Sequence, residues 1–314
     1  MEEKKTHEPL ITILGPTATG KTKVAVRIAH DLGGEIVSAD SRQVFRRMDI
    51  GTGKDLSDYT CNGRTIPAHL IDIEEPGTEY NVFRYQQAAY DAIQDIRNRS
   101  LRPVLCGGSG MYIEAVLRGY RLFPVPENRP LRESLSSKSD TELTSLLASY
   151  KSLHNDTDTS ERDRLVRAIE IEDYYRAHPE LSERVKPMDS CIIGLRGDRD
   201  AIRDKITRRL HERLQEGMVE EVKNLLDDGV DPKRLVRYGL EYKFVTKYII
   251  GELAYGDMVA QLNTAIHQFS KRQMTWFRRM ERMGFNIHWI DISVSEKEKM
   301  DDIYHFLSKN GIKI

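Results

Sequence analysis

Length, composition and charge exclude several classes of protein. At 314 residues the chain can bury a sizeable core, either as one large domain or as a core with a second unit. It has 48 Lys and Arg against 49 Asp and Glu, and the net charge of -1 excludes a global positive field, so any nucleic-acid partner must meet a local basic patch.

In chain order, the first predicted elements form a strand, helix, strand unit. The apolar run Leu10–Leu14 is too short for a signal sequence or a membrane span, and we predict that it is a buried strand. A helix over residues 22–32 and a second strand over Glu35–Ala39 are predicted to follow. This alternation is typical of a parallel sheet that helices cover on both faces.

Later segments are predicted to extend this sheet on either side of a different middle section. We predict a helix over Val82–Arg99 and four further strands, at His69–Ile73, Pro103–Cys106, Ile192–Leu195 and Asn286–Ile292. Residues 119–189 are polar and helical without a convincing strand, so we expect a helical insertion. Apolar residues at helical spacing predict two more helices, over residues 200–216 and 257–283.

The predicted elements indicate two domains, and the cysteine content indicates a cytoplasmic protein. Residues 1–118 and 190–314 are expected to form the α/β core with C-terminal helices, and residues 119–189 a small helical insertion domain. The three cysteines, Cys61, Cys106 and Cys191, contain no C-x-x-C pair, which favours a reducing compartment over a disulfide framework or a metal site. We expect a monomeric cytoplasmic protein without a membrane partner.

The segment between the first predicted strand and helix fits the P-loop motif G-x-x-x-x-G-K-[ST]. Its backbone amides surround an anion at a helix N-terminus, Lys21 adds a positive charge, and the Thr22 hydroxyl can ligate Mg²⁺. The motif does not show whether the bound phosphate belongs to ATP. We predict a P-loop NTPase-like α/β fold whose diphosphate-binding residues are Gly15, Pro16, Thr17, Ala18, Thr19, Gly20, Lys21 and Thr22.

Two other segments should reach the carboxyl edge of this sheet, where open α/β folds bind ligands. Asp40 follows the second strand and is a candidate base facing the phosphate, although an Asp at such a position can also cap a turn. The glycine-rich residues 107–110 let the backbone approach the same crevice, or form only a tight turn. A clear Walker B strand is missing, with Asp72 the nearest candidate, which argues against a motor-type NTPase.

A series of segments in chain order matches one family. They are Gly15–Thr22, Ser38–Val44, Met48–Lys54, His69–Ile73, Gly107–Ser109 and Lys271–Arg278. Together they resemble the tRNA dimethylallyltransferase family, the isopentenyltransferases that prenylate adenosine beside the anticodon. The resemblance implies transfer of a dimethylallyl group from dimethylallyl diphosphate to N6 of adenosine 37 in tRNAs reading codons that begin with U. The P-loop would then hold that diphosphate with Mg²⁺.

Position by position, the resemblance assigns residues to this reaction. The family's catalytic Asp falls on Asp40, its Gly-Gly-Thr threonine on Ser109, and a diphosphate-binding arginine on Arg209, while Thr22 is the implied Mg²⁺ ligand. Contacts to the tRNA anticodon stem-loop are implied for Asp40, Ser41, Arg42, Gln43, Ser109, Arg164, Arg167, Lys271, Arg272, Gln273, Trp276 and Arg278.

Two regions depart from the family pattern. Residues 159–164 replace the usual His-Pro-Asn-Asp-x-x-Arg stretch, keeping Arg164 and the following Arg167 but not the Asn-Asp part. Leu240–Lys243 has Glu241 where glycine is typical. We expect both regions to concern tRNA contact rather than diphosphate binding.

The implied mechanism neutralises the leaving diphosphate with Mg²⁺, Lys21 and Arg209, while Asp40 accepts a hydrogen from the attacking adenine N6. The adenosine must be flipped out of the stacked anticodon loop. Two runs of basic residues are available for the tRNA backbone, although solvated charged faces are the common alternative. They are Arg203, Lys205, Arg208, Arg209 and Arg213, and Lys271, Arg272, Arg278, Arg279 and Arg282.

Three other functions share parts of this pattern. A small-molecule kinase of the nucleoside-kinase type would use the same P-loop and an Asp at this strand end to activate a hydroxyl. A prenyltransferase acting on free adenine nucleotides would share the core but need no basic tRNA surface. A regulatory nucleotide-binding module would not need Asp40 opposite the P-loop.

Overall fold

The computed structural model describes residues 8–120, 122–151, 153, 159, 161–182 and 187–314. The chain divides into two compact units. Unit 1 comprises Met1–Gly119 and Pro187–Ile314, and unit 2 comprises Tyr120–Lys186.

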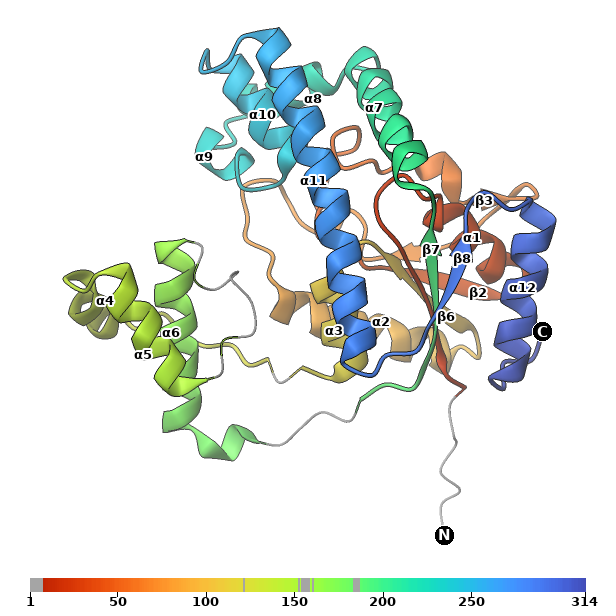
Figure 1. The fold of residues 1–314 in the computed structure, drawn as a ribbon, viewed down its shortest axis with the longest axis horizontal. Coiled ribbons are helices and arrows are strands. Elements are labelled where there is room, and N and C mark those ends of the chain that lie inside the picture. Colours follow the sequence, from red (N-terminus) through yellow and green to blue (C-terminus); the bar gives the residue numbers. More distant parts are fainter. Residues whose placement is uncertain (1–7, 121, 152, 154–158, 160, 183–186) are drawn as a thin grey trace. The chain divides into compact units, whose positions relative to one another are not determined.

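Unit 1 is built on a six-stranded sheet in which every pair of neighbours is parallel, as the alternation of strands and helices predicts (Figure 1). The strand order is β5-β2-β6-β1-β7-β8. The strands are β1 (Leu10–Leu14), β2 (Gly34–Ser38), β5 (Ala68–His69), β6 (Arg102–Gly107), β7 (Ser190–Arg196) and β8 (Ile287–Asp291). The P-loop strand β1 therefore lies between β6 and β7, at the centre of the sheet.

Helices cover both faces of the sheet because alternate residues of a strand point to opposite sides. Ile11 and Ile13 of β1 pack in one cluster with α1 (Lys21–Leu32) and α12 (Glu296–Lys309). Leu10 and Leu14 pack in another cluster with α2 (Val82–Asn98), α3 (Gly110–Arg118) and the C-terminal half of α11 (Tyr255–Arg282). The central strands are consequently buried on both sides, which explains their continuous apolar sequence.

A third hydrophobic cluster lies among the helices that follow β7. It joins the N-terminal half of α11 to α7 (Arg199–Gln215), α8 (Met218–Asp227), α9 (Pro232–Leu235) and α10 (Leu240–Ile249). Figure 1 shows these helices above the sheet, on the side toward which β7 runs. The remaining elements of unit 1 are η1 (Leu56–Tyr59), β3 (Thr60–Cys61) and β4 (Arg64–Thr65).

Unit 2 contains α4 (Arg129–Ser136), α5 (Asp140–Tyr150), α6 (Arg162–Ala177) and the short η2 (Pro179–Ser182). Its described residues include no strand. Its small core of leucines and Ile169 is supported by a buried carboxylate, Glu170. Glu170 accepts hydrogen bonds from the Asn128 N–H at 2.5 Å, from Arg132 at 2.9 Å and from Arg167.

The predicted strand His69–Ile73 is wrong beyond its first residue. Leu70 and Asp72 have positive φ angles of 65° and 55°, a left-handed backbone that cannot continue a strand. The Asp72 side chain instead binds the buried Lys54 at 2.5 Å. Asp72 is therefore a structural ion-pair partner and not a Walker B carboxylate.

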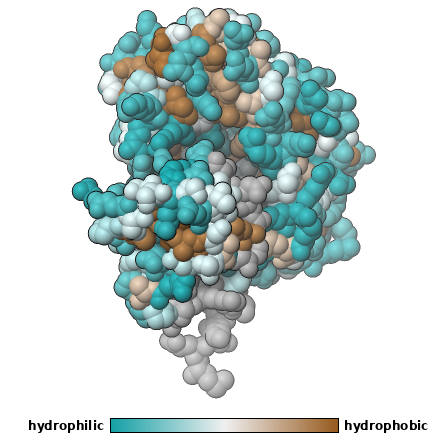
Figure 2. Space-filling view, turned by 60° about the vertical axis from the view of Figure 1, so that its left-hand side comes forward, coloured by the Kyte–Doolittle hydropathy of each residue, from teal (hydrophilic) through white to brown (hydrophobic). Residues whose placement is uncertain are grey.

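One face of the molecule is seen in Figure 2 and is largely polar. Hydrophilic residues cover most of the face in Figure 2, with hydrophobic residues in small groups. Within the described ranges, none of the helices has an apolar stretch long enough to span a bilayer.

Candidate active site

The P-loop folds back over the N-terminus of α1. Ala18 and Gly20 have positive φ angles of 64° and 75°, and Gly20 is the N-cap of α1. The Thr19 hydroxyl donates to Pro16 O at 2.8 Å and so closes the loop on itself. The first amides of α1 have no helical partner, which makes this helix terminus suitable for binding an anion.

Lys21 stands beside these amides, and its Nζ donates to Pro16 O at 3.4 Å. Burial lowers the pKa of Lys21, Cys106 and Asp40 act in the opposite direction, and Arg209 and Arg213 lower it further. A bound anion would favour the charged form by adding negative charge nearby. Burial also raises the pKa of Cys106 to about 12, so this neighbouring thiol stays protonated and is no nucleophile at neutral pH.

Asp40 follows β2 and lines the same pocket as Lys21. Its Oδ1 accepts a hydrogen bond from the Arg42 N–H at 2.9 Å, as in an Asx turn. Among the described residues, none donates to Oδ2. Asp40 therefore caps the turn with one carboxylate oxygen and keeps the other available for a ligand, so the two interpretations of this residue are compatible.

Ser109 joins the glycine segment after β6 to the turn after β2. Its Oγ accepts from the Ser41 N–H at 3.1 Å, and its own N–H donates to Ala39 O at 3.2 Å. Gly107 is needed for this approach because a Cβ there would lie 2.2 Å from Ala39 O. The two strand ends are thus fixed to each other, and Asp40, Ser41 and Ser109 line one pocket.

Gln273 of α11 holds the P-loop to this glycine segment. Its Oε1 accepts from the Thr17 N–H at 2.9 Å, and its Nε2 donates to Gly108 O at 2.9 Å. The residue is only 7% exposed. Because both ends of the amide bind the protein itself, Gln273 positions the P-loop; the tRNA contact that we expected for it stays a prediction.

The Met48–Lys54 segment forms a loop beside the pocket, which Gly51, Thr52 and Gly53 line. Gln43 donates to Gly53 O at 3.1 Å. Glu221 of α8 accepts from the N–H groups of Asp49, Ile50 and Gly51 at 2.8, 2.7 and 3.0 Å. The loop is therefore held by a carboxylate distant in sequence, a contact that the sequence does not predict.

Two arginines of α7 enter the pocket opposite the P-loop. Arg209 and Arg213, one helical turn apart, line it together with Lys21 and Thr22. Arg209 donates to Asp55 at 2.8 Å. We expected Arg209 here but placed Arg213 only in a basic run; the four-residue spacing on a helix is the signal that could have found it. Glu241, which we expected to concern tRNA contact alone, also lines this pocket of about 110 Å³.

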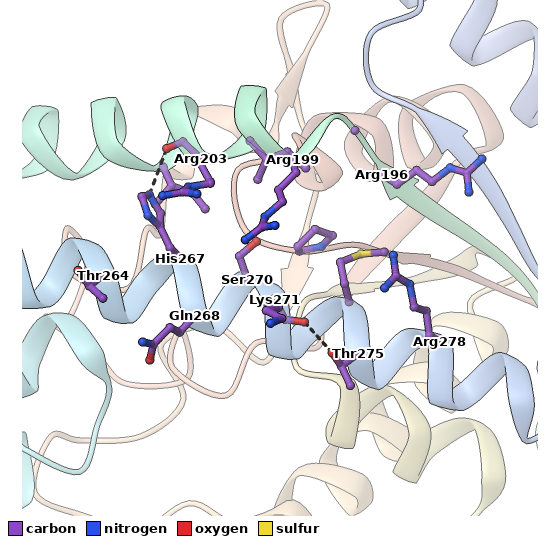
Figure 3. Close-up of a pocket in the computed structure, with 15 residues that line it drawn as sticks. Arg196, Arg199, Arg203, Thr264, His267, Gln268, Ser270, Lys271, Thr275 and Arg278 are labelled. Atoms are coloured by element: carbon purple, nitrogen blue, oxygen red, sulfur yellow. Dashed lines mark hydrogen bonds between the residues drawn. The ribbon is translucent and has the colours of Figure 1, made fainter.

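A second cavity, of about 690 Å³, lies between α7 and α11 and reaches Pro16 of the P-loop (Figure 3). Ile202, Ile206 and Met274 give it an apolar lining. Its lining residues include no acid, and its cations come from both helices and the end of β7; they are Arg196, Arg199, Arg203, Lys271 and Arg278. In Figure 3 Arg199 points from α7 toward Ser270 of α11.

The other residues of the α11 segment have different surroundings. Arg272 is exposed, and its guanidinium lies 6.0 Å from the Phe269 ring centre. Trp276 packs against Gly110, where a Cβ would lie 2.4 Å from the indole ring. The α7 basic run is likewise divided, because Arg203 faces the second cavity while Arg209 and Arg213 face the P-loop.

Arg164 and Arg167 belong to unit 2. Arg164 is exposed and pairs with Glu161 at 3.3 Å, whereas Arg167 binds Glu170 and donates to Val125 O at 2.7 Å. Arg167 thus stabilises unit 2 internally, and tRNA contact by both residues stays a prediction.

Thr22 is the side chain of the P-loop suited to Mg²⁺, and it lines the pocket beside Lys21 and Asp40. The described part of the chain has no group of three or more His, Cys, Asp or Glu that could hold a metal ion. A site with one hydroxyl ligand suits Mg²⁺, which commonly takes its remaining ligands from substrate phosphates and water.

A parallel sheet with a P-loop at its centre, and a carboxylate at the end of β2, one strand removed from the P-loop strand, define a P-loop enzyme acting on a phosphorylated substrate. Two family models match the chain and identify the kind of P-loop enzyme. The model described as IPP transferase matches residues 43–280, and the model described as isopentenyl transferase matches residues 9–65. The chain therefore belongs to the IPP transferase family and is a prenyl-group transferase.

Similar proteins cover nearly the whole chain. "tRNA dimethylallyltransferase 1" of Parabacteroides distasonis is 58% identical over 297 residues, 94% of this chain and 96% of that protein. "tRNA dimethylallyltransferase 1" of Porphyromonas gingivalis is 56% identical over 96% of this chain and its own full length.

Solved structures resemble the fold. The full-length tRNA isopentenylpyrophosphate transferase of Bacillus halodurans is 31% identical, with a TM-score of 0.71 and 97% of each chain covered. A eukaryotic dimethylallyltransferase acting on tRNA has a TM-score of 0.79 and covers 98% of this chain and 81% of its own, but at 20% identity it supports the fold alone.

Proposed function

We propose that this enzyme transfers the dimethylallyl group from dimethylallyl diphosphate to N6 of adenosine 37, next to the anticodon, in tRNAs reading codons that begin with U. The carrying observation is that Asp40 and the P-loop Lys21 line one pocket, so a base and an anion-binding group face the same small volume. The relatives named tRNA dimethylallyltransferase support this choice of donor and acceptor.

The donor end of the pocket stabilises the departing diphosphate. The α1 amides and Lys21 offer hydrogen bonds and charge on one side, and Arg209 offers a guanidinium on the other. As the allylic C1–O bond breaks, negative charge grows on the diphosphate, so these groups act most strongly in the transition state. Mg²⁺ held at Thr22 would add further charge neutralisation.

The acceptor end activates a weak nucleophile. The lone pair of an adenine exocyclic amine is delocalised into the ring, so N6 needs its hydrogen drawn away as it attacks C1. The free Oδ2 of Asp40 can accept that hydrogen, and Ser109 and Ser41 hold the Asp40 turn in place. The adenosine must leave the stacked anticodon loop to reach this pocket.

The tRNA backbone is proposed to lie along the second cavity. In the part of the chain that the structure describes, its five cations, Arg196, Arg199, Arg203, Lys271 and Arg278, have no acidic partner within 4.0 Å. On a chain with a net charge of -1, they form the local basic patch that a nucleic acid requires. The other proposed tRNA contacts are Asp40, Ser41, Arg42, Gln43, Ser109, Arg164, Arg167, Arg272, Gln273 and Trp276. We also propose that the protein acts as a monomer and that it acts in the cytoplasm.

One assay tests the proposal. Radiolabelled dimethylallyl diphosphate is incubated with unmodified tRNA and, separately, with AMP. We expect label in tRNA at adenosine 37 and none in AMP. Label in AMP alone would indicate that the acceptor is a free nucleotide and not tRNA. Absence of label from both tRNA and AMP would contradict prenyl transfer.

A further inference from the structure

Arg213 is a cation of the P-loop pocket that the reaction above does not use. Its side chain is 12% exposed, compared with 32% for Arg209, which lies one helical turn before it. The chain therefore places the largely buried Arg213 beside a second, partly exposed cation, Arg209, and next to Lys21. Such an arrangement is unfavourable unless something negative compensates it.

The hydrogen-bonding capacity of Arg213 is not used inside the protein. Its Nη2 is shielded from solvent and has no hydrogen-bond partner among the described residues. The carboxylate of Asp55 is 3.9 Å away, and the same oxygen accepts the shorter bond from Arg209, at 2.8 Å. A buried, charged donor without an acceptor is costly, and a ligand oxygen is the usual compensation at a functional site.

The neighbouring loop is shaped to admit this guanidinium. A Cβ at Gly53 would lie 1.9 Å from Arg213 Nη2 and 2.6 Å from Arg209 Nη2. Gly53 also has a φ of +67°, which favours glycine. The bond from Gln43 to Gly53 O fixes this approach, so the two arginines are held over the same glycine.

Acidic residues around Arg213 offset part of the positive charge. Burial and Arg209 lower the pKa of Arg213, while Glu241, Asp55 and Glu216 act in the opposite direction. Glu241 lines the pocket with Arg213, at the position where the family resemblance leads us to expect glycine. The pocket thus contains a cation, Arg213, and a carboxylate, Glu241, in addition to the residues that the proposed reaction uses.

We propose that Arg213 is a second diphosphate-binding arginine, which donates hydrogen bonds to the diphosphate of the prenyl donor from the side opposite the P-loop. Glu241 balances its charge while no anion is bound. The identity of the donor rests on the proposed function, whereas the diphosphate class of the ligand follows from the P-loop beside it.

The test measures binding of inorganic pyrophosphate to the full chain by calorimetry in the presence of Mg²⁺. Arg213→Met keeps much of the side-chain stem and removes the guanidinium, and Arg208→Met makes the same change at an exposed position of α7 outside both cavities. We expect Arg213→Met to weaken pyrophosphate binding about 10- to 100-fold, because a charge-assisted bond is lost. Arg208→Met should bind like the wild type.

Thermal unfolding supplies a second readout. Removing a buried guanidinium whose Nη2 donor has no acceptor should raise the melting temperature of ligand-free Arg213→Met above that of the wild type. Pyrophosphate should then stabilise the wild type more than this variant. Equal pyrophosphate affinity in the two proteins would overturn the proposal, as would a lower melting temperature of Arg213→Met, since Arg213 would then be a structural residue.

This test is separable from the proposed function. Pyrophosphate binding requires neither tRNA nor a prenyl chain, so absence of prenyl transfer would contradict the proposed reaction and leave the assignment of Arg213 standing. Conversely, normal pyrophosphate binding by Arg213→Met would show that Arg213 does not bind the diphosphate, and the proposed reaction would still stand.

Discussion

Gln273 and Thr17, 256 residues apart in the chain, are joined by a hydrogen bond of 2.9 Å from the Thr17 N–H to Gln273 Oε1. The other end of the same amide binds Gly108 O. One buried side chain of α11 therefore fixes the distance between the phosphate-binding loop and the glycine segment that precedes Ser109.

Replacing Gln273 by Leu should disturb donor binding more than tRNA binding. The Thr17 N–H and Gly108 O lose their partner, and each buried group left unsatisfied costs about 1–3 kcal/mol of the free energy of unfolding. We expect a higher KM for dimethylallyl diphosphate and an unchanged Kd for tRNA in filter binding. A loss confined to tRNA affinity would show that Gln273 contacts tRNA and does not act on the donor.

Lys21→Ala and Thr22→Ala should impair use of the diphosphate for different reasons. Lys21→Ala removes a charge-assisted hydrogen bond, which should raise the KM for dimethylallyl diphosphate about 10- to 100-fold. Thr22→Ala should shift the Mg²⁺ concentration required for half-maximal activity upward, whereas Thr22→Ser keeps the hydroxyl and should behave like the wild type. Unchanged donor kinetics in both alanine variants would contradict the P-loop assignment.

Charge reversal in the second cavity should weaken tRNA binding without changing tRNA preference. Lys271→Glu and Arg278→Glu remove two of the proposed phosphate contacts, and contacts of this kind position a nucleic acid but do not read its bases. Each lost contact should reduce the slope of log affinity against log salt by about 0.7 for single-stranded RNA. Lys309→Glu, an equal charge change on the exposed end of α12, is the matched control. Binding that does not depend on salt would remove α11 from the interface.

The site was partly predictable from sequence because some of its determinants are local. The apolar run Leu10–Leu14 and the adjoining P-loop motif predict a strand, a glycine-containing turn and a helix within one short segment, and the structure has all three; anion binding by the turn stays a prediction. The prediction of a strand at His69–Ile73 was wrong because Leu70 and Asp72 have positive φ angles, which the hydropathy pattern does not reveal.

The remaining determinants are contacts between distant segments. The bonds that Gln273 accepts from the Thr17 N–H and that Glu221 accepts from the Ile50 N–H join residues more than 100 positions apart. No spacing rule connects such residues, since their approach depends on how the helices pack around the sheet. Arg213 is an intermediate case, because its four-residue spacing from Arg209 predicts that both lie on one face of α7, whereas the closeness of that face to Lys21 is seen only in the structure.

Acid should destabilise unit 2 through Glu170. Burial raises the pKa of Glu170, but hydrogen bonds from Arg132, the Asn128 N–H and Arg167 outweigh it and bring the pKa to about 2, from an ordinary value of 4.5. A carboxylate whose pKa is lower in the folded state stabilises the fold above its unfolded pKa. This stabilisation should therefore be complete above about pH 5 and be lost as the pH falls from 4.5 toward 2.

Urea unfolding followed as a function of pH checks this expectation. Glu170→Gln, which cannot titrate, should be less stable than the wild type near pH 7 and approach it in acid. Arg167→Ala should share part of this loss because Arg167 is one of the partners of Glu170. A wild-type stability that stays constant between pH 5 and pH 3 would contradict the ionised state of Glu170.

Asp40→Asn should fold and bind both substrates yet transfer prenyl groups far more slowly. The Asn side-chain oxygen can still accept the bond from the Arg42 N–H, so the turn keeps its cap. The amide nitrogen that replaces Oδ2 cannot accept a hydrogen from adenine N6. A general base typically contributes about 10²- to 10⁴-fold, so the loss should fall on the chemical step.

Single-turnover transfer with both substrates saturating isolates that step from binding and product release. Asp40→Ala is the matched variant, because it removes the cap as well as the base and should lose stability in addition to rate. Near-wild-type single-turnover rates in Asp40→Asn, with a defect only in Asp40→Ala, would make Asp40 a structural cap. A loss of tRNA affinity alone in Asp40→Asn would instead assign Asp40 to positioning the adenine, and the base would have to be another group of the same pocket.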